Sequence, residues 1–151
     1  MIKVVNWLIY EYADQYYKSA EFLLQQTSTD ILTYGTPAIV NMAFAIELYL
    51  KTIYVLETMK EPVREHKYND LFNKLSYESQ QQIREQFIKH YVGDESFDDL
   101  LNYYSNTFQE LRYAYEAHSI NHVRYNDLKL LAIVARKRCE DIIAARFPSK
   151  N

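Results

Sequence analysis

The sequence predicts an all-α protein, a helical bundle of four to five long helices plus a short helix. Two observations support this class. The 151 residues include only two glycines and three prolines, whereas strand-rich folds use these residues in their frequent tight turns. Apolar residues also recur at three- and four-residue spacings along most of the chain, which is the periodicity of amphipathic helices. The length is that of one typical domain, so we expect a single domain over residues 1–151.

The first part of the chain contains two predicted long helices. Residues 4–26 have apolar side chains at helical spacing with charged residues mostly between them. The second helix is predicted to begin at Pro37 with Thr36 as its N-cap, because the first turn does not need the N–H that proline lacks. It runs to Thr58 and is apolar nearly all the way round, which is typical of a central helix packed on most sides.

The remaining elements follow from breaks in the same periodicity. Ser76 is the candidate N-cap of the helix that follows it, and the apolar pattern restarts at Ser96. Asn126 or Asp127 is the expected cap of the last helix. The predicted elements are a short helix at 69–75, helices at 76–91 and 97–115, a loop or short hairpin at 117–125, and a final helix to Phe147.

Charge and composition narrow the functional classes. Lys and Arg number 17 against 20 Asp and Glu, for a formal charge of −3. This charge argues against binding of nucleic acid by bulk electrostatics, so any RNA must bind at a local patch. Fifteen tyrosines favour a partly wet interface such as a dimer contact. The single cysteine, Cys139, cannot form an internal disulfide or a multi-thiolate metal site, and it is either buried filler or a reactive thiol.

Targeting signals are not apparent. The N-terminal residues lack the long apolar run of a signal peptide. The longest apolar stretch, residues 37–56, is interrupted by Asn41, Glu47 and Lys51, which argues against a membrane span. We therefore expect a cytoplasmic protein without membrane contact.

Charged residues at helical spacing form the main candidate site. Glu47 and Lys51 are four apart on the most apolar helix, in the favourable order for an ion pair; they form either an exposed strip or an inward pair that needs partners from elsewhere. Arg112 and Glu116 repeat this spacing on a later helix. The two pairs together predict a polar seam, either a salt-bridge box that sets helix register or an anion site in which the guanidinium binds phosphate.

Histidines supply the remaining candidates. His66 precedes the short helix and is either a helix cap or a proton-transfer residue, since imidazole titrates near neutral pH. His118 and His122 have a metal-binding spacing only if they lie on a helix, but the expected loop and the lack of a nearby third ligand argue against a metal. The chain has no glycine-rich phosphate loop, nucleophile elbow or thiolate cluster, so no metal and no cofactor is expected.

Together these residues resemble the HEPN superfamily, helical domains named from higher eukaryotes and prokaryotes nucleotide-binding proteins. Three pieces carry the resemblance, in the order that the family shows, over roughly the middle half of the chain. They are AFAIELYLK at residues 43–51, His66 with DLFNKL at residues 70–75, and the segment from Phe108 to Glu116.

The resemblance implies a HEPN-like up-and-down bundle of four or five helices, usually a homodimer. Many members are metal-independent RNA endonucleases of toxin–antitoxin or phage-defence systems, and others are paired with a minimal nucleotidyltransferase. Their shared motif is an Arg followed, after four to six residues, by a His at the dimer cleft. Arg112 and His118, with five residues between them, match it and would be the catalytic pair, with Glu47, Lys51, His66 and Glu116 as supports.

Within the resemblance, His118 would be the general acid or base and Arg112 would stabilise the phosphate charge. The residues leave open whether His118, His66 or neither pairs with Arg112. The alternative is a non-catalytic module that binds a nucleotide or a partner, such as a nucleotidyltransferase or an antitoxin, and that dimerises.

Overall fold

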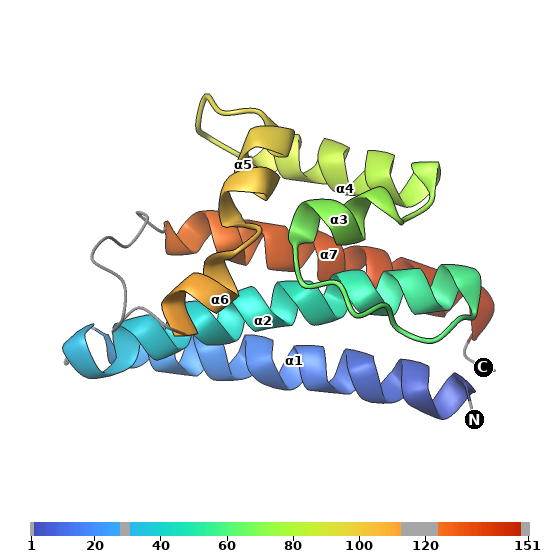
Figure 1. The fold of residues 1–151 in the computed structure, drawn as a ribbon, viewed down its shortest axis with the longest axis horizontal. Coiled ribbons are helices and arrows are strands. Elements are labelled where there is room, and N and C mark those ends of the chain that lie inside the picture. Colours follow the sequence, from blue (N-terminus) through green and yellow to red (C-terminus); the bar gives the residue numbers. More distant parts are fainter. Residues whose placement is uncertain (1, 28–30, 113–123, 149–151) are drawn as a thin grey trace.

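A computed structural model describes residues 2–27, 31–112 and 124–148, and within these ranges the chain is all-helical without strands. The predicted all-α bundle is confirmed (Figure 1). The elements, in chain order, are α1 (Ile2–Gln26), α2 (Ile31–Thr58), α3 (Tyr68–Asn73), α4 (Tyr77–His90), α5 (Phe97–Tyr104), α6 (Thr107–Arg112) and α7 (Tyr125–Arg146).

Helix α2 is the central element, as its nearly all-round apolar surface predicts. It packs along α1 on one side and α7 on the other, with α3 and α6 over a further face (Figure 1). Its fully buried side chains include Met42, Ile46, Tyr49 and Ile53. Length and composition alone would let Tyr34–Thr58 cross a membrane, but 61% of its most apolar window is buried inside the bundle, and the core helix of a soluble protein passes the same test.

Helices α3, α4 and α5 form a smaller layer around an aromatic cluster. The Phe97 ring packs on Phe72 and Phe87, with centroids 5.1 and 5.3 Å apart. The Arg84 guanidinium lies over both Phe72 and Phe97 and pairs with Asp98. This layer rests on α7 and α2, so the core continues from the long helices into the short ones.

The predicted start of α2 is wrong. The helix begins at Ile31, so Thr36 is not its N-cap and Pro37 lies inside the helix. A proline in a helix removes one backbone hydrogen bond. The extra turns of α2 continue alongside α1 (Figure 1), and this packing outweighs the loss of one bond.

The predicted continuous helix at 97–115 is also wrong, because α5 ends at Tyr104 and α6 begins at Thr107. Ser105, which is buried, ends α5. Its Oγ lies 2.8 Å from the Leu101 carbonyl oxygen and accepts the Asn69 N–H at 3.2 Å. The serine hydroxyl thus bonds both its own helix and α3, and the break allows α6 to turn onto α2.

Of the other predicted caps, Ser76 is confirmed and the one at Asn126 or Asp127 is wrong. Ser76 accepts the Ser79 N–H and Ser96 accepts the Asp99 N–H, each at 3.1 Å, as helix caps do. Helix α7 instead begins after Arg124, without a side-chain cap. Asp127 is a buried first-turn residue whose carboxylate bonds Tyr104 and Arg124.

Candidate functional site

The candidate site centres on Glu47, a carboxylate in the middle of α2 with only 1% of its surface exposed. Its Oε1 lies 3.2 Å from the Lys51 Nζ, one turn further along the helix. The same oxygen lies 2.5 Å from Nδ1 of His66, in the connection between α2 and α3. We call Glu47, Lys51 and His66 the Glu47 cluster. Of the two predicted arrangements of Glu47 and Lys51, the inward pair is therefore the one observed.

The exposure of the three side chains differs sharply. The Glu47 side chain is 1% exposed, Lys51 13% and His66 55%. A buried carboxylate is costly unless cations or donors compensate it, and here two nitrogens share one oxygen. The other oxygen, Oε2, has no hydrogen-bond partner among the described residues. The cluster is thus buried at its base and open at the imidazole.

A histidine held by a carboxylate has a defined chemical role. When the neutral imidazole donates its Nδ1–H to Glu47, its Nε2 is left as a proton acceptor. The carboxylate also fixes the orientation of the imidazole ring. Because His66 is more than half exposed, this arrangement can transfer protons to and from a bound molecule.

The other predicted site residues fall on the end of α6 and beyond it. Arg112 is the last residue of α6, and α6 packs against α2. The side chain of Arg112, together with Glu116, His118 and His122, lies outside the described residues. The structure therefore brings together Glu47, Lys51 and His66 and does not test the pairing with Arg112 and His118.

A second polar cluster, which the sequence did not indicate, lies on the other side of α2. The Tyr49 hydroxyl donates to Asp14 Oδ1 at 2.5 Å. Arg136 donates from Nε to Oδ1 at 3.1 Å and from Nη2 to Oδ2 at 3.4 Å. We call Asp14, Tyr49 and Arg136 the Asp14 cluster. It joins α1, α2 and α7 through residues up to 122 positions apart, a separation at which no sequence spacing signals contact.

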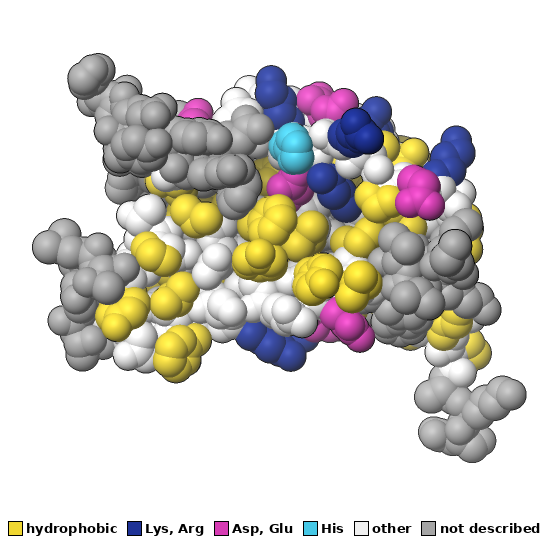
Figure 2. Space-filling view, turned by 60° about the horizontal axis from the view of Figure 1, so that its bottom comes forward, with side chains coloured by type: hydrophobic (Ala, Val, Ile, Leu, Met, Phe, Trp, Pro, Cys, Tyr) yellow, Lys and Arg dark blue, Asp and Glu magenta, His cyan; other side chains and the backbone are white. Residues whose placement is uncertain are grey.

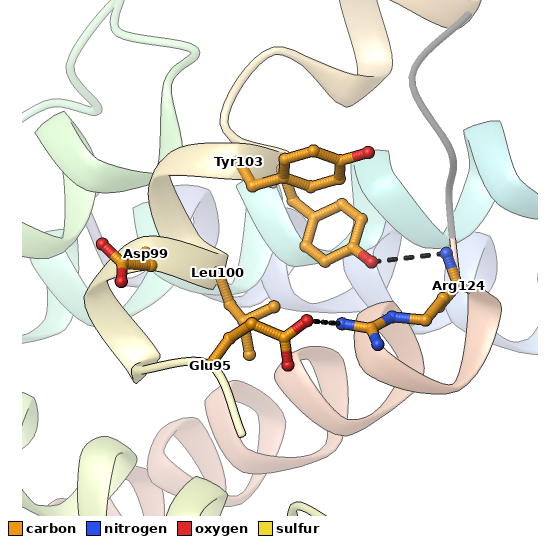
Figure 3. A pocket seen from close by; sticks show the side chains of 6 residues that line it. Glu95, Asp99, Leu100, Tyr103 and Arg124 are labelled. Carbon is orange, nitrogen blue, oxygen red and sulfur yellow. Dashed lines mark hydrogen bonds and ion pairs between the residues drawn. The ribbon is translucent and has the colours of Figure 1, made fainter. Parts of the chain in front are cut away.

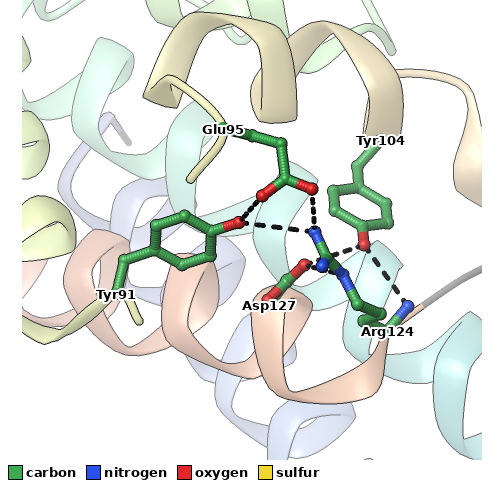
Figure 4. Close-up of polar contacts among 5 residues, drawn as sticks. All are labelled: Tyr91, Glu95, Tyr104, Arg124 and Asp127. Atoms are coloured by element: carbon green, nitrogen blue, oxygen red, sulfur yellow. Dashed lines mark hydrogen bonds and ion pairs between the residues drawn. The ribbon is translucent and has the colours of Figure 1, made fainter. Parts of the chain in front are cut away.

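A third network surrounds Arg124 at the start of α7 (Figure 4). The guanidinium pairs with Glu95 through Nη2 and with Asp127 through Nε, both at 2.8 Å. Tyr91 donates to Glu95, and this bond, followed by a backbone hydrogen bond and the contact with Arg124, lowers the Glu95 pKa to about 2. Tyr104 accepts the Arg124 backbone N–H at 3.3 Å and donates to Asp127 at 3.0 Å. The charge of Arg124 is therefore matched by two carboxylates.

A cavity of about 450 Å³ opens beside this network (Figure 3). Its walls are Asp99, Leu100, Tyr103 and Tyr104 from α5, with Glu95 and Arg124. We call it the Tyr103 cavity. Within the described ranges no group of three or more His, Cys, Asp or Glu side chains is arranged to hold a metal ion.

Cys139 is fully buried in α7, with its Sγ 3.4 Å from the Tyr49 carbonyl oxygen. Burial raises the pKa of its thiol. It is the buried filler of the two predicted alternatives, because a buried thiol with a raised pKa is a poor nucleophile.

Comparisons with family models, with curated proteins and with solved structures found no match to this chain.

Proposed function

We propose that this chain is a HEPN-like, metal-independent RNA endonuclease of a toxin–antitoxin or phage-defence type system, acting in the cytoplasm. The observation that carries the proposal is the exposed imidazole of His66 bound through Nδ1 to the buried Glu47 carboxylate, at 2.5 Å. Lys51 adds a cation at the same carboxylate. Three polar groups at a core helix thus supply a proton-transfer residue, its orienting carboxylate and a positive charge.

The proposed reaction needs these groups and no metal. The ribose 2′-hydroxyl loses its proton to a general base, and its oxygen forms a bond to the adjacent phosphorus. The bond from phosphorus to the 5′-oxygen breaks, and a general acid protonates that oxygen. The products end in a 2′,3′-cyclic phosphate and a 5′-hydroxyl. A cation near the non-bridging oxygens stabilises the negative charge that builds up there.

The proposal assigns these roles as follows. Arg112 and His118 are the catalytic pair, with Arg112 stabilising the phosphate charge. His66 is the second proton-transfer group, and Glu47 positions it. Lys51 and Glu116 support the charge balance of the site. With a net charge of −3, the chain binds RNA through this local set of cations and not through a basic face.

We further propose that the active form is a homodimer that uses the outer face of α1. Leu8, Tyr12 and Tyr16 recur every four residues on this helix and are 36–47% exposed, and Phe22 is 61% exposed. Hydrophobic side chains gather over α1 and α2 in Figure 2. An exposed apolar surface that follows one helix is typical of a protein–protein contact, and tyrosine suits an interface that keeps some water.

Cleavage of labelled single-stranded RNAs in EDTA buffer tests the activity. We expect shortened products with 2′,3′-cyclic phosphate ends, and no cleavage when the 2′-hydroxyl at the cut site is replaced by hydrogen. The Arg112→Ala variant, purified in parallel, should be folded and inactive. Intact RNAs after incubation with protein of confirmed dimeric mass would contradict the proposal.

The alternative function is a non-catalytic dimerisation module that binds a nucleotide or a partner, such as a minimal nucleotidyltransferase or an antitoxin. The acidic net charge and the ion pair that neutralises Lys51 favour it. In this case the polar seam is a structural box, so Arg112→Ala should lower the melting temperature and no variant should change RNA cleavage. A thermal melt of Arg112→Ala therefore separates the two functions.

A further inference from the structure

The outer face of α1 has a charged edge beside its apolar residues. Glu11 and Lys18 are both exposed on α1, and because they are seven residues apart, nearly two helical turns, they point to the same side of the helix. Within the part of the chain that the structure describes, neither side chain forms an ion pair. Figure 2 shows basic and acidic side chains along the lower edge of the hydrophobic surface over α1 and α2.

The opposite edge of the same face is aromatic. The Tyr16 ring packs edge-on against Phe44 of α2, with centroids 4.6 Å apart. Leu8, Tyr12 and Phe22, each more than 40% exposed, lie between the two edges. The face therefore has charges along one side and an aromatic ring along the other, and this asymmetry restricts how two copies can meet.

Two copies of one helix face meet through a two-fold axis. If the two helices ran in the same direction, the charged edge of one would lie against the Tyr16 edge of the other. If they run in opposite directions, the two charged edges lie side by side. Only this second arrangement brings Glu11 to Lys18 of the partner subunit, and such pairs beside an apolar seam select the orientation of paired helices.

We propose that a second copy of this chain docks antiparallel on α1, with the two-fold axis level with residues 14 and 15. The inference rests on the homodimer of the proposed function and adds its orientation and register. Glu11 is then level with the partner's Lys18, and by symmetry Lys18 is level with the partner's Glu11, so the contact contains two ion pairs. Leu8 lies within about 1.5 Å, one helical rise, of the level of the partner's Phe22.

This register also relates the dimer axis to the candidate site. Asp14 bonds Tyr49 and Tyr16 contacts Phe44, so residues 14 and 15 are level with the turn of α2 that carries Glu47. The two Glu47 clusters are therefore level with each other across the dimer.

Cross-linking of single-cysteine additions to the whole chain tests the orientation. Gln15→Cys lies beside its own copy at the axis, so mild oxidation should give a disulfide-linked dimer on electrophoresis without reductant. Ser19→Cys is the matched control, because the antiparallel register separates it from its own copy by roughly 13 Å along the helices, beyond the reach of a disulfide. The native Cys139 is fully buried and serves both variants as a common background. Equal cross-linking of the two variants would show a parallel pair and overturn the proposal.

Charge reversal tests the register. Glu11→Lys places like charges against each other twice and should weaken dimerisation about tenfold by sedimentation; Lys18→Glu should do the same. The double variant restores both pairs and should dimerise like the parent. Glu85→Lys makes the same charge change on an exposed residue of α4 and should leave dimerisation unchanged. A double variant weaker than either single variant would overturn the proposal.

The outcomes separate this inference from the function on which it rests. A monomeric parent overturns both the inference and the homodimer. A dimer in which both cysteine variants cross-link overturns the orientation and keeps the α1 interface, whereas a dimer in which neither does overturns the interface itself. Thermal melts show that each variant keeps its fold, and if a charge-reversed variant is unstable the cysteine pair decides. RNA cleavage by the parent is measured separately and decides the nuclease alone.

Discussion

Helix α2 takes part in two polar clusters, and the difference between them separates a structural network from a candidate active site. In the Asp14 cluster both carboxylate oxygens accept hydrogen bonds, from Tyr49 and from Arg136. In the Glu47 cluster Lys51 and His66 both contact the same carboxylate oxygen, Oε1. Both oxygens of Asp14 are bonded within the fold, whereas the other oxygen of Glu47, the buried Oε2, has no partner among the described residues.

The position of the exposed group differs as well. Tyr49 is buried in the core. The Arg136 side chain is 32% exposed, lies over the Tyr17 ring and forms an ion pair with Asp14. In the Glu47 cluster the most exposed member is the imidazole, at 55%, whose Nε2 can form a hydrogen bond with another molecule. The partly buried Asp14 carboxylate therefore joins helices, whereas the buried Glu47 carboxylate holds an exposed imidazole.

The largest effect is expected from His66→Ala. Loss of a general acid or base should lower RNA cleavage about 10²- to 10⁴-fold, while stability falls by about 1–2 kcal/mol because the buried Glu47 carboxylate loses one of its two partners. Cleavage rates and urea unfolding measure the two quantities. The matched control is His90→Ala, an exposed histidine at the end of α4, which should keep full activity. A large loss of stability with unchanged cleavage would show that the Glu47 cluster is structural and not catalytic.

Asp14→Ala should be the most destabilising change. It removes the carboxylate that accepts hydrogen bonds from Tyr49 and Arg136, which costs about 2–4 kcal/mol of stability. Cleavage per folded molecule should stay at the parent level. Asp141→Ala removes an aspartate from the exposed pair with Lys137, and it should cost less than about 0.5 kcal/mol. Similar losses of stability for both variants would show that the Asp14 cluster contributes no more than an exposed ion pair.

Tyr49→Phe tests the same cluster with a smaller change. The ring and its packing remain and only the hydroxyl that donates to Asp14 is lost, so we expect a loss of about 1.5–3 kcal/mol, the range for a hydrogen bond to a charged group. Tyr77→Phe is the control, since Tyr77 is 77% exposed. Equal stability of the two variants by chemical denaturation would contradict the assigned bond.

The smallest effect concerns alkaline pH. Burial, followed by the charges of Asp14 and Glu140, raises the Tyr10 pKa from 10.0 to about 12. The unfolded chain loses this proton near pH 10 and the folded chain only near pH 12, so the folded state binds more protons in between and stability falls as pH rises across that window. Denaturant midpoints at several pH values should show a flatter profile in Tyr10→Phe. An unchanged slope in that variant would exclude Tyr10 as a contributor.

Much of the helical framework could be read from local residue patterns. Ser76 was predicted as a cap because a hydroxyl before an apolar repeat satisfies free N–H groups at short range. Glu47 and Lys51 are one helical turn apart, and on so apolar a helix an inward pair was one of the two expected outcomes. His66 and Glu47 were predicted to belong to the same polar seam. Their direct contact was not predicted.

The errors occurred where distant packing overruled local preference. Pro37 and Thr36 have the features of a helix start, yet α2 begins at Ile31 because its extra turns pack along α1. Ser105 stands in an apolar stripe that fits one continuous helix, and its bond to Asn69 of α3 helps to end α5. Asp127 has the character of a cap but binds Tyr104 and Arg124 instead.

The sequence by itself determined that this protein is helical, that α2 is its central element, and which charged residues are too costly to bury alone. These properties depend on spacings of a few residues, which a helix converts directly into faces. Only the tertiary structure decided which charges are paired, because Asp14, Tyr49 and Arg136 come from three helices, and His66 reaches Glu47 through a connection without regular structure. Contacts over such separations depend on the packing of whole helices, and it is this packing that closes one cluster and leaves the other open.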